Sequence, residues 1–272
     1  MILLTNGDSW TQGDYPSQTL NWEATKSLDW YDIIPHFGDE SNKCDRRTLY
    51  KFYDSPVWPK VLGEKLGIET WNCGRLGADM SRIFFSTIYS ISHLEMLGKT
   101  DIFVVIQLTS NLRYRNLLLN PIGGREKRGP KNERTGIYQG YKFQYELMKI
   151  SAENYPINSD VLYRQNLQSL IFLQSFLKQK NIPHLIYNGF DNDIYDNWSG
   201  LSEYKYIDFD YIYKQDGQWP LEPVFKNYIE NNFDSLWGKN GEYFHSNHPT
   251  DKSHIEWGNH LYDYIKENYE LF

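Results

Sequence analysis

Four short apolar runs that alternate with helical patterns constrain the fold of this chain more than any other feature. The apolar runs cover residues 1–6, 67–72, 102–108 and 182–188, and the helical patterns cover residues 57–66, 79–97, 160–177 and a stretch from about residue 253. Continuous apolar runs are typical of strands that are buried on both faces of a sheet. Strands that alternate with helices predict right-handed crossovers, and therefore a parallel sheet covered by helices on both faces.

Apolar residues at helical spacing predict which side of each helix faces the core. Asp160 is expected to cap the third helix, and Ser253 and Glu256 form a predicted capping box at the start of the last one. The residues expected to face inward are Met80, Ile83, Phe84, Ile88, Ile91, Leu94, Tyr163, Leu167, Leu170, Ile171, Leu177, Ile255, Leu261 and Ile265.

The length of 272 residues, 40% of them hydrophobic, is sufficient for one large domain, and we predict a single domain over residues 1–272. Three stretches lack strong periodicity, at about residues 14–55, 112–158 and 189–245. Structureless loops of that length are unusual inside a compact domain. We therefore expect these stretches to be functional insertions with some structure of their own.

Charge and hydropathy argue against several classes of protein. The formal net charge of −7 disfavours general binding to nucleic acid or to anionic membranes. No stretch approaches the roughly 20 apolar residues that a membrane span requires, and the N-terminus lacks both a basic leader and a small-residue cleavage site. The sequence therefore predicts a cytoplasmic protein, or one that is released without a cleaved signal.

The spacing of cysteine and histidine does not support a disulfide framework or a metal site. Cys44 and Cys73 are the only cysteines and are expected to be reduced. Four histidines near the C-terminus match no standard zinc spacing: His245, His248, His254 and His260. We expect no metal and no other cofactor, and we interpret His254 and His260 as helix residues.

Chemically useful side chains follow the predicted strands or precede the last helix. Gly7, Asp8 and Ser9 follow the first strand directly, and polar segments at residues 72–81 and 107–111 follow the second and third. A histidine-rich segment, residues 245–254, stands before the final helix. In parallel sheets the chemistry lies beyond the carboxyl ends of the strands. A serine nucleophile needs a base and oxyanion donors, and these segments supply each type.

The order and context of these segments resemble the SGNH (GDSL-like) hydrolase superfamily, whose four blocks contribute serine, glycine, asparagine and histidine. Ser9 matches the nucleophile, and Gly77 matches the glycine of the second block. Asn111 matches the asparagine of the third block, and His248 matches the histidine of the fourth. The resemblance covers the framework, about half of the chain, and leaves the insertions unexplained.

The resemblance implies a flavodoxin-like three-layer α/β/α sandwich that hydrolyses an ester or carries out a related acyl transfer. His248 would deprotonate Ser9, which attacks the acyl carbon. The resulting oxyanion would be held by the backbone N–H groups of Ser9 and Gly77 and by the side-chain amide of Asn111. Removing one such donor typically raises the barrier by about 2.7–4 kcal/mol.

Three positions depart from the family pattern. Thr109 stands where a glycine is usual, and Leu112 stands where an aspartate often follows. His245 occupies the position three residues before His248, where the family has aspartate. Histidine cannot supply the fixed negative charge that orients an imidazolium.

The missing aspartate leaves three alternatives open. The protein works as a Ser-His dyad in which a backbone or water acceptor orients His248, or a carboxylate from elsewhere does so, or the site is degenerate. The nearest carboxylates in sequence are Glu242 and Asp251, and His245 and Asp8 are further candidates for an orienting or accessory role. The residues alone do not decide among these alternatives.

Two features of the insertions bear on the substrate. Residues 113–134 are strongly basic, and Arg113 and Arg115 lie nearest the strand end, where they would favour an anionic group such as a uronate, sulfate or phosphate. The alternative is a solvated loop, or one paired with the acidic residues between positions 191 and 210. Residues 187–219 are rich in aromatic side chains, which either pack the insertion or stack on sugar rings.

The sequence thus predicts a serine esterase that acts on a small-molecule or glycan ester, such as an O-acyl or O-acetyl group on a carbohydrate. A non-catalytic glycan-binding or structural protein with a degenerate site is the alternative from a different class. An acyltransferase on the same fold is the third. The sequence gives no prediction of oligomeric state, and fold alone does not determine substrate.

Overall fold

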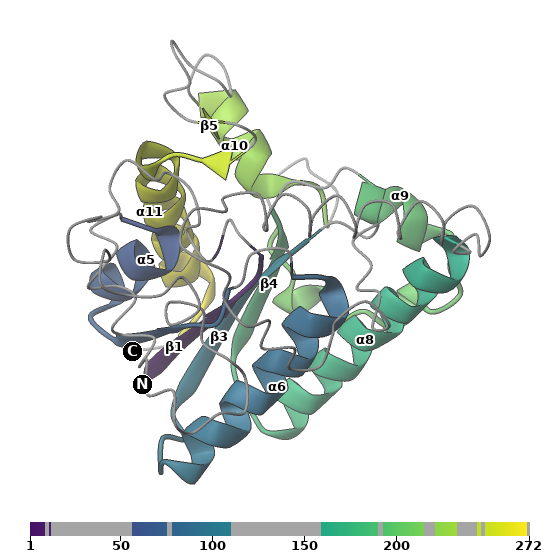
Figure 1. Cartoon of the computed structure of the whole chain (residues 1–272), viewed down its shortest axis with the longest axis horizontal. Coiled ribbons are helices and arrows are strands. Elements are labelled where there is room, and N and C mark those ends of the chain that lie inside the picture. Colours follow the sequence, from purple (N-terminus) through teal and green to yellow (C-terminus); the bar gives the residue numbers. More distant parts are fainter. Residues whose placement is uncertain are drawn as a thin grey trace, which may run out of the picture.

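The central element of the computed structural model is a parallel sheet of four strands (Figure 1). The structure describes residues 1–8, 11, 56–74, 78–109, 159–189, 193–214, 221–232, 244–245 and 248–270. The strands are β1 (Ile2–Asn6), β2 (Glu69–Asn72), β3 (Ile102–Leu108) and β4 (His184–Asn188), and their order across the sheet is β2-β1-β3-β4. This order is that of flavodoxin-like sheets, and the predicted parallel sheet is confirmed.

The register across the sheet is continuous, so the carboxyl ends of the four strands meet along one edge. Ile2 pairs with both Glu69 of β2 and Ile102 of β3, while Val104 of β3 pairs with His184 of β4. Beyond β4, two single parallel bridges extend the sheet, from Ile186 to Ile212 and from Asn188 to Pro223.

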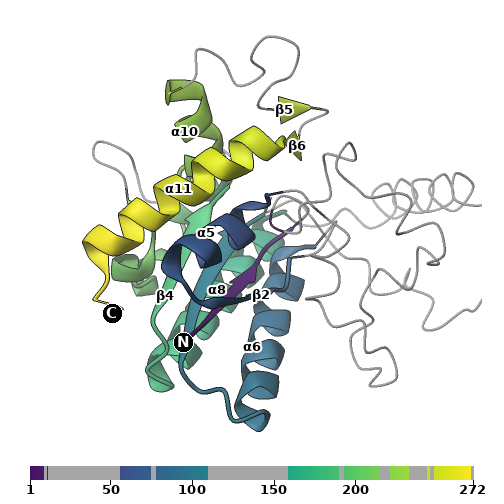
Figure 2. The same cartoon turned by 90° about the vertical axis from the view of Figure 1, so that its left-hand side faces the viewer.

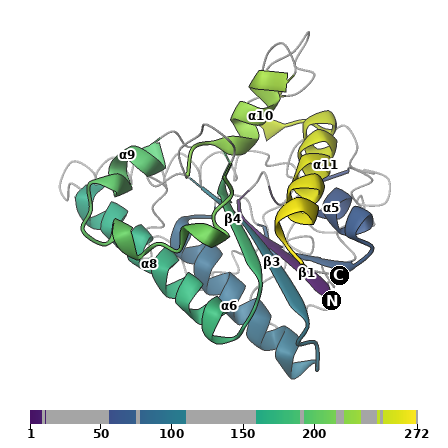
Figure 3. The same cartoon turned by 180° about the vertical axis from the view of Figure 1, so that it is seen from behind.

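Helices cover both faces of the sheet, which makes a three-layer α/β/α sandwich. The helices α5 (Trp58–Leu66), α10 (Val224–Asn232) and α11 (Asp251–Asn268) lie on one face, with α11 crossing in front of the sheet in Figure 2. The helices α6 (Met80–Met96) and α8 (Ser159–Gln179) lie side by side on the other face (Figure 3). The predicted fold class is confirmed.

Alternate side chains of each strand enter the two cores. On β3, Ile102, Val104 and Ile106 pack toward α6 and α8, whereas Phe103 and Val105 pack toward α5 and α11. All five side chains are buried, as expected for a strand covered on both faces.

The predicted helices form, with two corrections at their starts. Asp79 caps α6, because its carboxylate accepts the backbone N–H of Arg82 at 2.7 Å. Helix α8 begins at Ser159, which places Asp160 inside the first turn instead of at the cap. Helix α11 begins at Asp251 after Thr250, so the predicted capping box of Ser253 and Glu256 is wrong. The strand before α11 ends at a proline, and the helix starts as soon as the chain leaves it.

The inward face of α11 differs from the prediction at Ile255, whereas Leu261 and Ile265 are buried as expected. Ile255 is 38% exposed, whereas Trp257, Leu261 and Ile265, spaced four residues apart, are buried against the sheet. Ile255 lies about 200° around the helix axis from Trp257, since each residue turns the helix by about 100°. The large aromatic side chain therefore sets the buried face.

The stretch at 189–245 contains several short elements. Its described part contains α9 (Asp193–Ser199), α10, two short 3₁₀ turns (Tyr204–Tyr206 and Phe209–Tyr211) and a two-residue strand, β5 (Phe244–His245). Among the described aromatic side chains of this region, Trp198 and Tyr213 are buried and serve packing. Tyr206, by contrast, is exposed. The stretches at 14–55 and 112–158 lie outside the described residues. Among the helices of the described ranges, none has the length and apolar character of a membrane span.

Gly258 allows α11 to approach α5 closely. A Cβ added there would lie 2.8 Å from both Cβ and Cγ1 of Val61, and 3.2 Å from the carbonyl oxygen of Trp58. These atoms belong to a packed helix and have little freedom to move. Gly258→Ala is therefore expected to lower the free energy of unfolding by about 1–3 kcal/mol, although alanine is the better helix former.

Urea denaturation checks this prediction. Gly200→Ala serves as the control, because a Cβ at Gly200 would meet no atom within 4 Å. The control should stay within about 0.5 kcal/mol of the wild type. If Gly258→Ala were as stable as Gly200→Ala, then α5 and α11 could move apart to accept the added methyl group without loss of free energy of unfolding.

Candidate active site

All four strands of the sheet have an amide side chain at or next to their carboxyl end. Asn6, Asn72, Gln107 and Asn188 lie on β1, β2, β3 and β4, and all four are buried or nearly so. A buried amide carries both donors and acceptors that must be satisfied. This edge of the sheet is consequently held by side-chain hydrogen bonds, in contrast to the apolar cores below it.

Asn6 anchors the end of β1 to α6. Its Nδ2 donates toward Ser86 Oγ at 2.7 Å, Thr87 Oγ1 at 2.9 Å and the carbonyl oxygen of Ile83 at 2.9 Å. Its Oδ1 accepts the backbone N–H of Gly7 at 2.8 Å. The direction in which the chain leaves β1 is therefore fixed from the helix side.

Asn72 fixes the same turn from the side of β2. Its Nδ2 donates to the carbonyl oxygen of Thr11 at 2.7 Å, and its Oδ1 accepts the backbone N–H of Gly74 at 2.8 Å. The backbone N–H of Thr11 donates in turn to the carbonyl oxygen of Asp8 at 3.1 Å. Residues 8 and 11 are thus both held, one on each side of residue 9.

Asp8 is completely buried at this edge. Its Oδ1 accepts a hydrogen bond from Gln107 Nε2 at 3.1 Å, and its Oδ2 accepts one from Thr109 Oγ1 at 2.9 Å. Both donors come from the end of β3. Thr109, which stands where the SGNH pattern has a glycine, therefore donates a structural hydrogen bond in this chain.

Gln107 connects Asp8 to helix α11 through Tyr187. Its Oε1 accepts hydrogen bonds from Thr11 Oγ1 at 3.2 Å and from Tyr187 Oη at 3.3 Å. Tyr187 Oη in turn accepts the indole N–H of Trp257 on α11 at 3.0 Å. Burial, with a smaller contribution from the charge of Asp8, raises the pKa of Tyr187 well above its ordinary value, so this phenol remains a neutral donor.

Two glycines make room for this network. A Cβ on Gly7 would lie 2.1 Å from Thr11 Oγ1, and a Cβ on Gly189 would lie 2.8 Å from the amide of Gln107. Any larger residue at either position would displace a hydrogen-bonded side chain. The glycine that precedes Asp8 in the sequence motif is therefore required by close packing.

Removing the Tyr187 hydroxyl should measure the strength of the network. In Tyr187→Phe the buried indole N–H of Trp257 loses its acceptor and Gln107 loses a donor, so we expect the free energy of unfolding to fall by about 1–3 kcal/mol. Chemical denaturation measures this change. Tyr206→Phe is the matched control, because Tyr206 is 63% exposed, and it should change stability by less than about 0.5 kcal/mol. Losses of similar size in both variants would contradict the network's role.

Asn188 holds a strained residue beside the end of β4. Its Nδ2 donates to the carbonyl oxygen of Leu221 at 2.7 Å. Leu221 has a φ of 72° and a buried side chain, a backbone conformation that costs a leucine about 1–2 kcal/mol. Hydrogen bonding and burial together keep the chain in this conformation.

The histidine segment forms a small hairpin before α11. β5 pairs antiparallel with β6 (His248–Pro249), and the register places His245 directly opposite His248. The hairpin lies on the side of the molecule toward which the parallel strands point, next to the start of α11 (Figures 1 and 2). Thr250 then occupies the N-cap position of α11, without a capping hydrogen bond from its side chain, and Asp251 lies in the first turn.

The two histidines farther along the chain lie in α11, as expected, and both are packed. His254 is buried, and its Nδ1 accepts the backbone N–H of Trp58 at 3.3 Å, which links α11 to the start of α5. His260 stacks on Tyr228 and forms a short hydrogen bond with Tyr213. Burial lowers the pKa of His260, so it is mainly neutral at pH 7.

Most of the predicted site residues lie outside the described part of the chain. These residues are Ser9, Gly77, Asn111, Glu242, Arg113 and Arg115. Asp8 is described in full, His245 and His248 are described in their backbone pairing, and Asp251 lies in the first turn of α11. Asp8 thus lies at the carboxyl edge, and the roles of Ser9, Gly77, Asn111 and His248 stay predictions.

Two acidic residues of the late insertion pair with α8. Lys178 forms an ion pair with Asp208 at 2.6 Å, and Arg164 forms one with Glu203. Hydrogen bonds from Ser202 and Arg164 lower the pKa of Glu203 to about 2. Two of the acidic side chains considered as partners for the basic segment are therefore already paired elsewhere.

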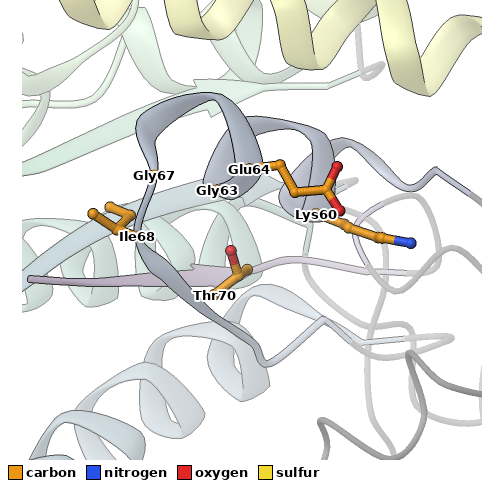
Figure 4. A pocket seen from close by; sticks show the side chains of 6 residues that line it. All are labelled: Lys60, Gly63, Glu64, Gly67, Ile68 and Thr70. Carbon is orange, nitrogen blue, oxygen red and sulfur yellow. The ribbon is translucent and has the colours of Figure 1, made fainter.

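A pocket with a volume of about 300 Å³ lies between α5 and β2 (Figure 4). It is lined by Lys60, Gly63, Glu64, Gly67, Ile68 and Thr70. Gly67 and Ile68 precede β2, so this pocket lies toward the amino end of the strand. It is separate from the carboxyl edge, where the buried network lies. No group of three or more potential metal ligands occurs within the described ranges.

No family model matches the sequence, and no curated protein matches it either. A solved structure of a carbohydrate esterase, whose active site displays divergent catalytic and non-catalytic binding functions, aligns with a TM-score of 0.45 and 11% identity. The alignment covers 99% of this chain and 66% of that one, so this chain spans just under two thirds of the other's length. The two backbones are only distantly similar. Membership of the SGNH superfamily therefore stays a prediction.

Proposed function

We propose that this protein is a serine esterase in which Ser9 is the nucleophile and His248 is the general base. The observation that carries the proposal is the anchoring of Asp8 at the carboxyl edge of the sheet. Its carboxylate is held by Gln107 and Thr109, and the backbone at Thr11 is tied to both Asp8 and Asn72. A nucleophile one residue after Asp8 would follow a backbone segment that hydrogen bonds hold in place. Catalysis requires such precise positioning of the reacting group.

The backbone of the histidine segment supports the same reading. Its hairpin leads directly into α11 on the side of the sheet's carboxyl ends. His248 would remove the proton of the Ser9 hydroxyl as the oxygen attacks the acyl carbon, and would return that proton to the leaving alcohol. Backbone N–H groups of Ser9 and Gly77 and the amide of Asn111 would stabilise the oxyanion.

The proposed substrate class is an O-acyl or O-acetyl ester on a carbohydrate or another small acceptor. Its support is the aromatic character of the late insertion, since aromatic faces stack on sugar rings. Among the described aromatic residues of the insertion, Tyr206 is exposed and does not pack in the core, so its ring could stack on a sugar. Trp198 and Tyr213 are buried. Arg113 and Arg115 would favour an acceptor that carries an anionic group.

Covalent labelling tests the nucleophile directly. The protein is incubated with a serine-directed fluorophosphonate and its intact mass is measured. We expect a single adduct on the wild type and on Ser92→Ala, which removes an exposed serine of α6, and none on Ser9→Ala. An unlabelled wild type would favour a binding protein with a degenerate site. A wild type that is labelled, and that consumes an ester substrate faster when a sugar acceptor is added, would favour an acyltransferase.

A further inference from the structure

We propose that the exposed face of α6 is a self-association surface, through which two copies of this chain form a dimer by packing their α6 helices against each other. The inference goes beyond the proposed esterase and does not depend on it. Three observations support it. They are the spacing of the exposed residues along α6, the neutral character of the helix between its ends, and the apolar area that α6 and its neighbour α8 expose.

Every exposed residue of α6 belongs to one stripe along the helix. The α6 stripe consists of Ser81, Phe85, Tyr89, Ser92 and Met96. Its spacing of four, four, three and four residues keeps the five side chains within about 80° of one another around the helix axis. The other side of the helix packs in the core through residues such as Ile83, Phe84 and Leu94. Large apolar side chains therefore occur on two sides of α6, and only one of them faces the core.

The spacing of the α6 stripe is that of a helix–helix seam. From Phe85 the residues recur after four, three and four positions, which is the alternation of a and d positions in paired helices. The two small residues, Ser81 and Ser92, leave space beside the large ones, into which side chains of a facing helix can insert. The stripe thus has the shape that favours a second helix as its occupant.

Electrostatics favour α6 of a second copy as that helix. No Asp, Glu, Lys or Arg occurs between Arg82 and Glu95. Two chains that each have a net charge of −7 repel each other, and this repulsion is least where a neutral surface meets a neutral surface. An antiparallel pair of helices also opposes the two helix dipoles. A two-fold axis between the α6 helices produces this arrangement, and two-fold dimers are the commonest oligomers.

Phe172 of α8 widens the apolar face at the middle of the stripe. Phe172, Phe176 and Lys180 lie four residues apart, and Lys180 Nζ lies 2.7 Å from Glu95 Oε1 at the end of α6. The two helices each lead into a strand of the parallel sheet, so they run side by side in the same direction (Figures 1 and 3). Eight residues of helix span about 12 Å, which brings Phe172 to the height of Phe85 and Tyr89.

The exposed apolar area is sufficient for a specific dimer. Phe85, Tyr89, Met96 and Phe172 are between 53% and 80% exposed. With about 200 Å² for each large side chain, they expose on the order of 500 Å² on each copy. Patches of this size on a monomer commonly mark interaction sites. A two-fold dimer would bury the patch of both copies, and the resulting total of about 1,000 Å² reaches the size that a specific interface needs.

Sedimentation equilibrium of the full chain tests the proposal. We expect the wild type to dimerise with a Kd in the micromolar range, as interfaces at the small end of the size range do. Phe85→Glu should weaken dimerisation by at least about 100-fold, because a two-fold interface would bury the new carboxylate twice. Ile255→Glu is the matched control, since Ile255 is 38% exposed on α11, on the other face of the sheet, and this variant should dimerise like the wild type.

Circular dichroism shows whether each variant is folded. A wild type that stays monomeric at about 100 µM would overturn the proposal. A dimer whose affinity is unchanged in folded Phe85→Glu, or equally weakened in Ile255→Glu, would also overturn it. Where Phe85→Glu does not fold, Met96→Glu at the end of α6 is measured instead and judged in the same way. None of these measurements depends on turnover, so failure of the dimer and failure of the esterase are seen separately.

Discussion

Replacing Ser9 with alanine is expected to lower kcat/KM for short-chain p-nitrophenyl esters by at least about 10³-fold. Without the hydroxyl there is no acyl-enzyme, and only the oxyanion donors and substrate binding remain to accelerate direct attack by water. His248→Ala is expected to cost a similar factor, because the neutral serine hydroxyl is a weak nucleophile unless a base removes its proton. The double variant should be little worse than either single one, since the two residues act as a unit.

The measurement is initial-rate kinetics on all three variants, with circular dichroism to show that each is folded. Ser92→Ala provides the matched control and should retain wild-type rates. Activity in Ser9→Ala equal to that of the wild type would refute the nucleophile assignment. Loss in Ser9→Ala with full activity in His248→Ala would leave the nucleophile in place and require a different base.

Acidification from pH 7.5 to pH 4 is expected to remove about 3 kcal/mol of folding free energy through His184 alone. His184 is buried at the start of β4, its Nδ1 lies 3.0 Å from the carbonyl oxygen of Ile182, and its ring stacks on Tyr211 at 4.0 Å. Its Nε2 has no hydrogen-bond partner among the described residues. Burial therefore lowers the pKa of His184 from 6.5 to about 4.

The sign follows from proton binding. Between pH 6.5 and pH 4 the unfolded chain binds a proton at this histidine and the folded chain does not, so the unfolded state gains stability as the pH falls. The contribution is fully present above pH 6.5 and is lost progressively toward pH 4.

Urea denaturation of the wild type and His184→Phe at pH 7.5 and pH 4 isolates this contribution. Phenylalanine retains a ring that can stack on Tyr211 and does not titrate. The wild type should lose about 3 kcal/mol more than the variant over this interval, because the acidic groups common to both proteins cancel in the comparison. Equal losses would show that the imidazole becomes solvated when it is protonated.

The sheet and its helices were predictable because hydrophobic periodicity is a local property. The run at residues 102–108 became β3 without a change at either end, and the apolar stripe of α6 is buried nearly as expected. The last helix was predicted less well. A serine and a glutamate three residues apart occur inside helices as well as at their starts, and Pro249 was the better indication of where α11 begins.

The network around Asp8 could not be predicted, because its partners are distant in sequence. Gln107 lies 99 residues from Asp8, and Tyr187 lies 80 residues from Gln107. A buried carboxylate and a solvated one look alike in a Gly-Asp-Ser motif. One available signal was the recurrence of an amide residue at the end of each predicted strand. The other was Thr109, a departure from the SGNH pattern whose hydroxyl donates to Asp8.

Helix α11 follows all four strands along the chain, and this order has a consequence for biosynthesis. Trp257, Leu261 and Ile265 cover part of the face of the sheet formed by Leu3, Phe103 and Val105. The ribosome makes all four strands before it makes this helix, so part of one apolar face stays open to solvent until α11 has emerged. Such an intermediate is a substrate for chaperones and is prone to aggregate. A chain that stalls before α11 should accordingly be insoluble.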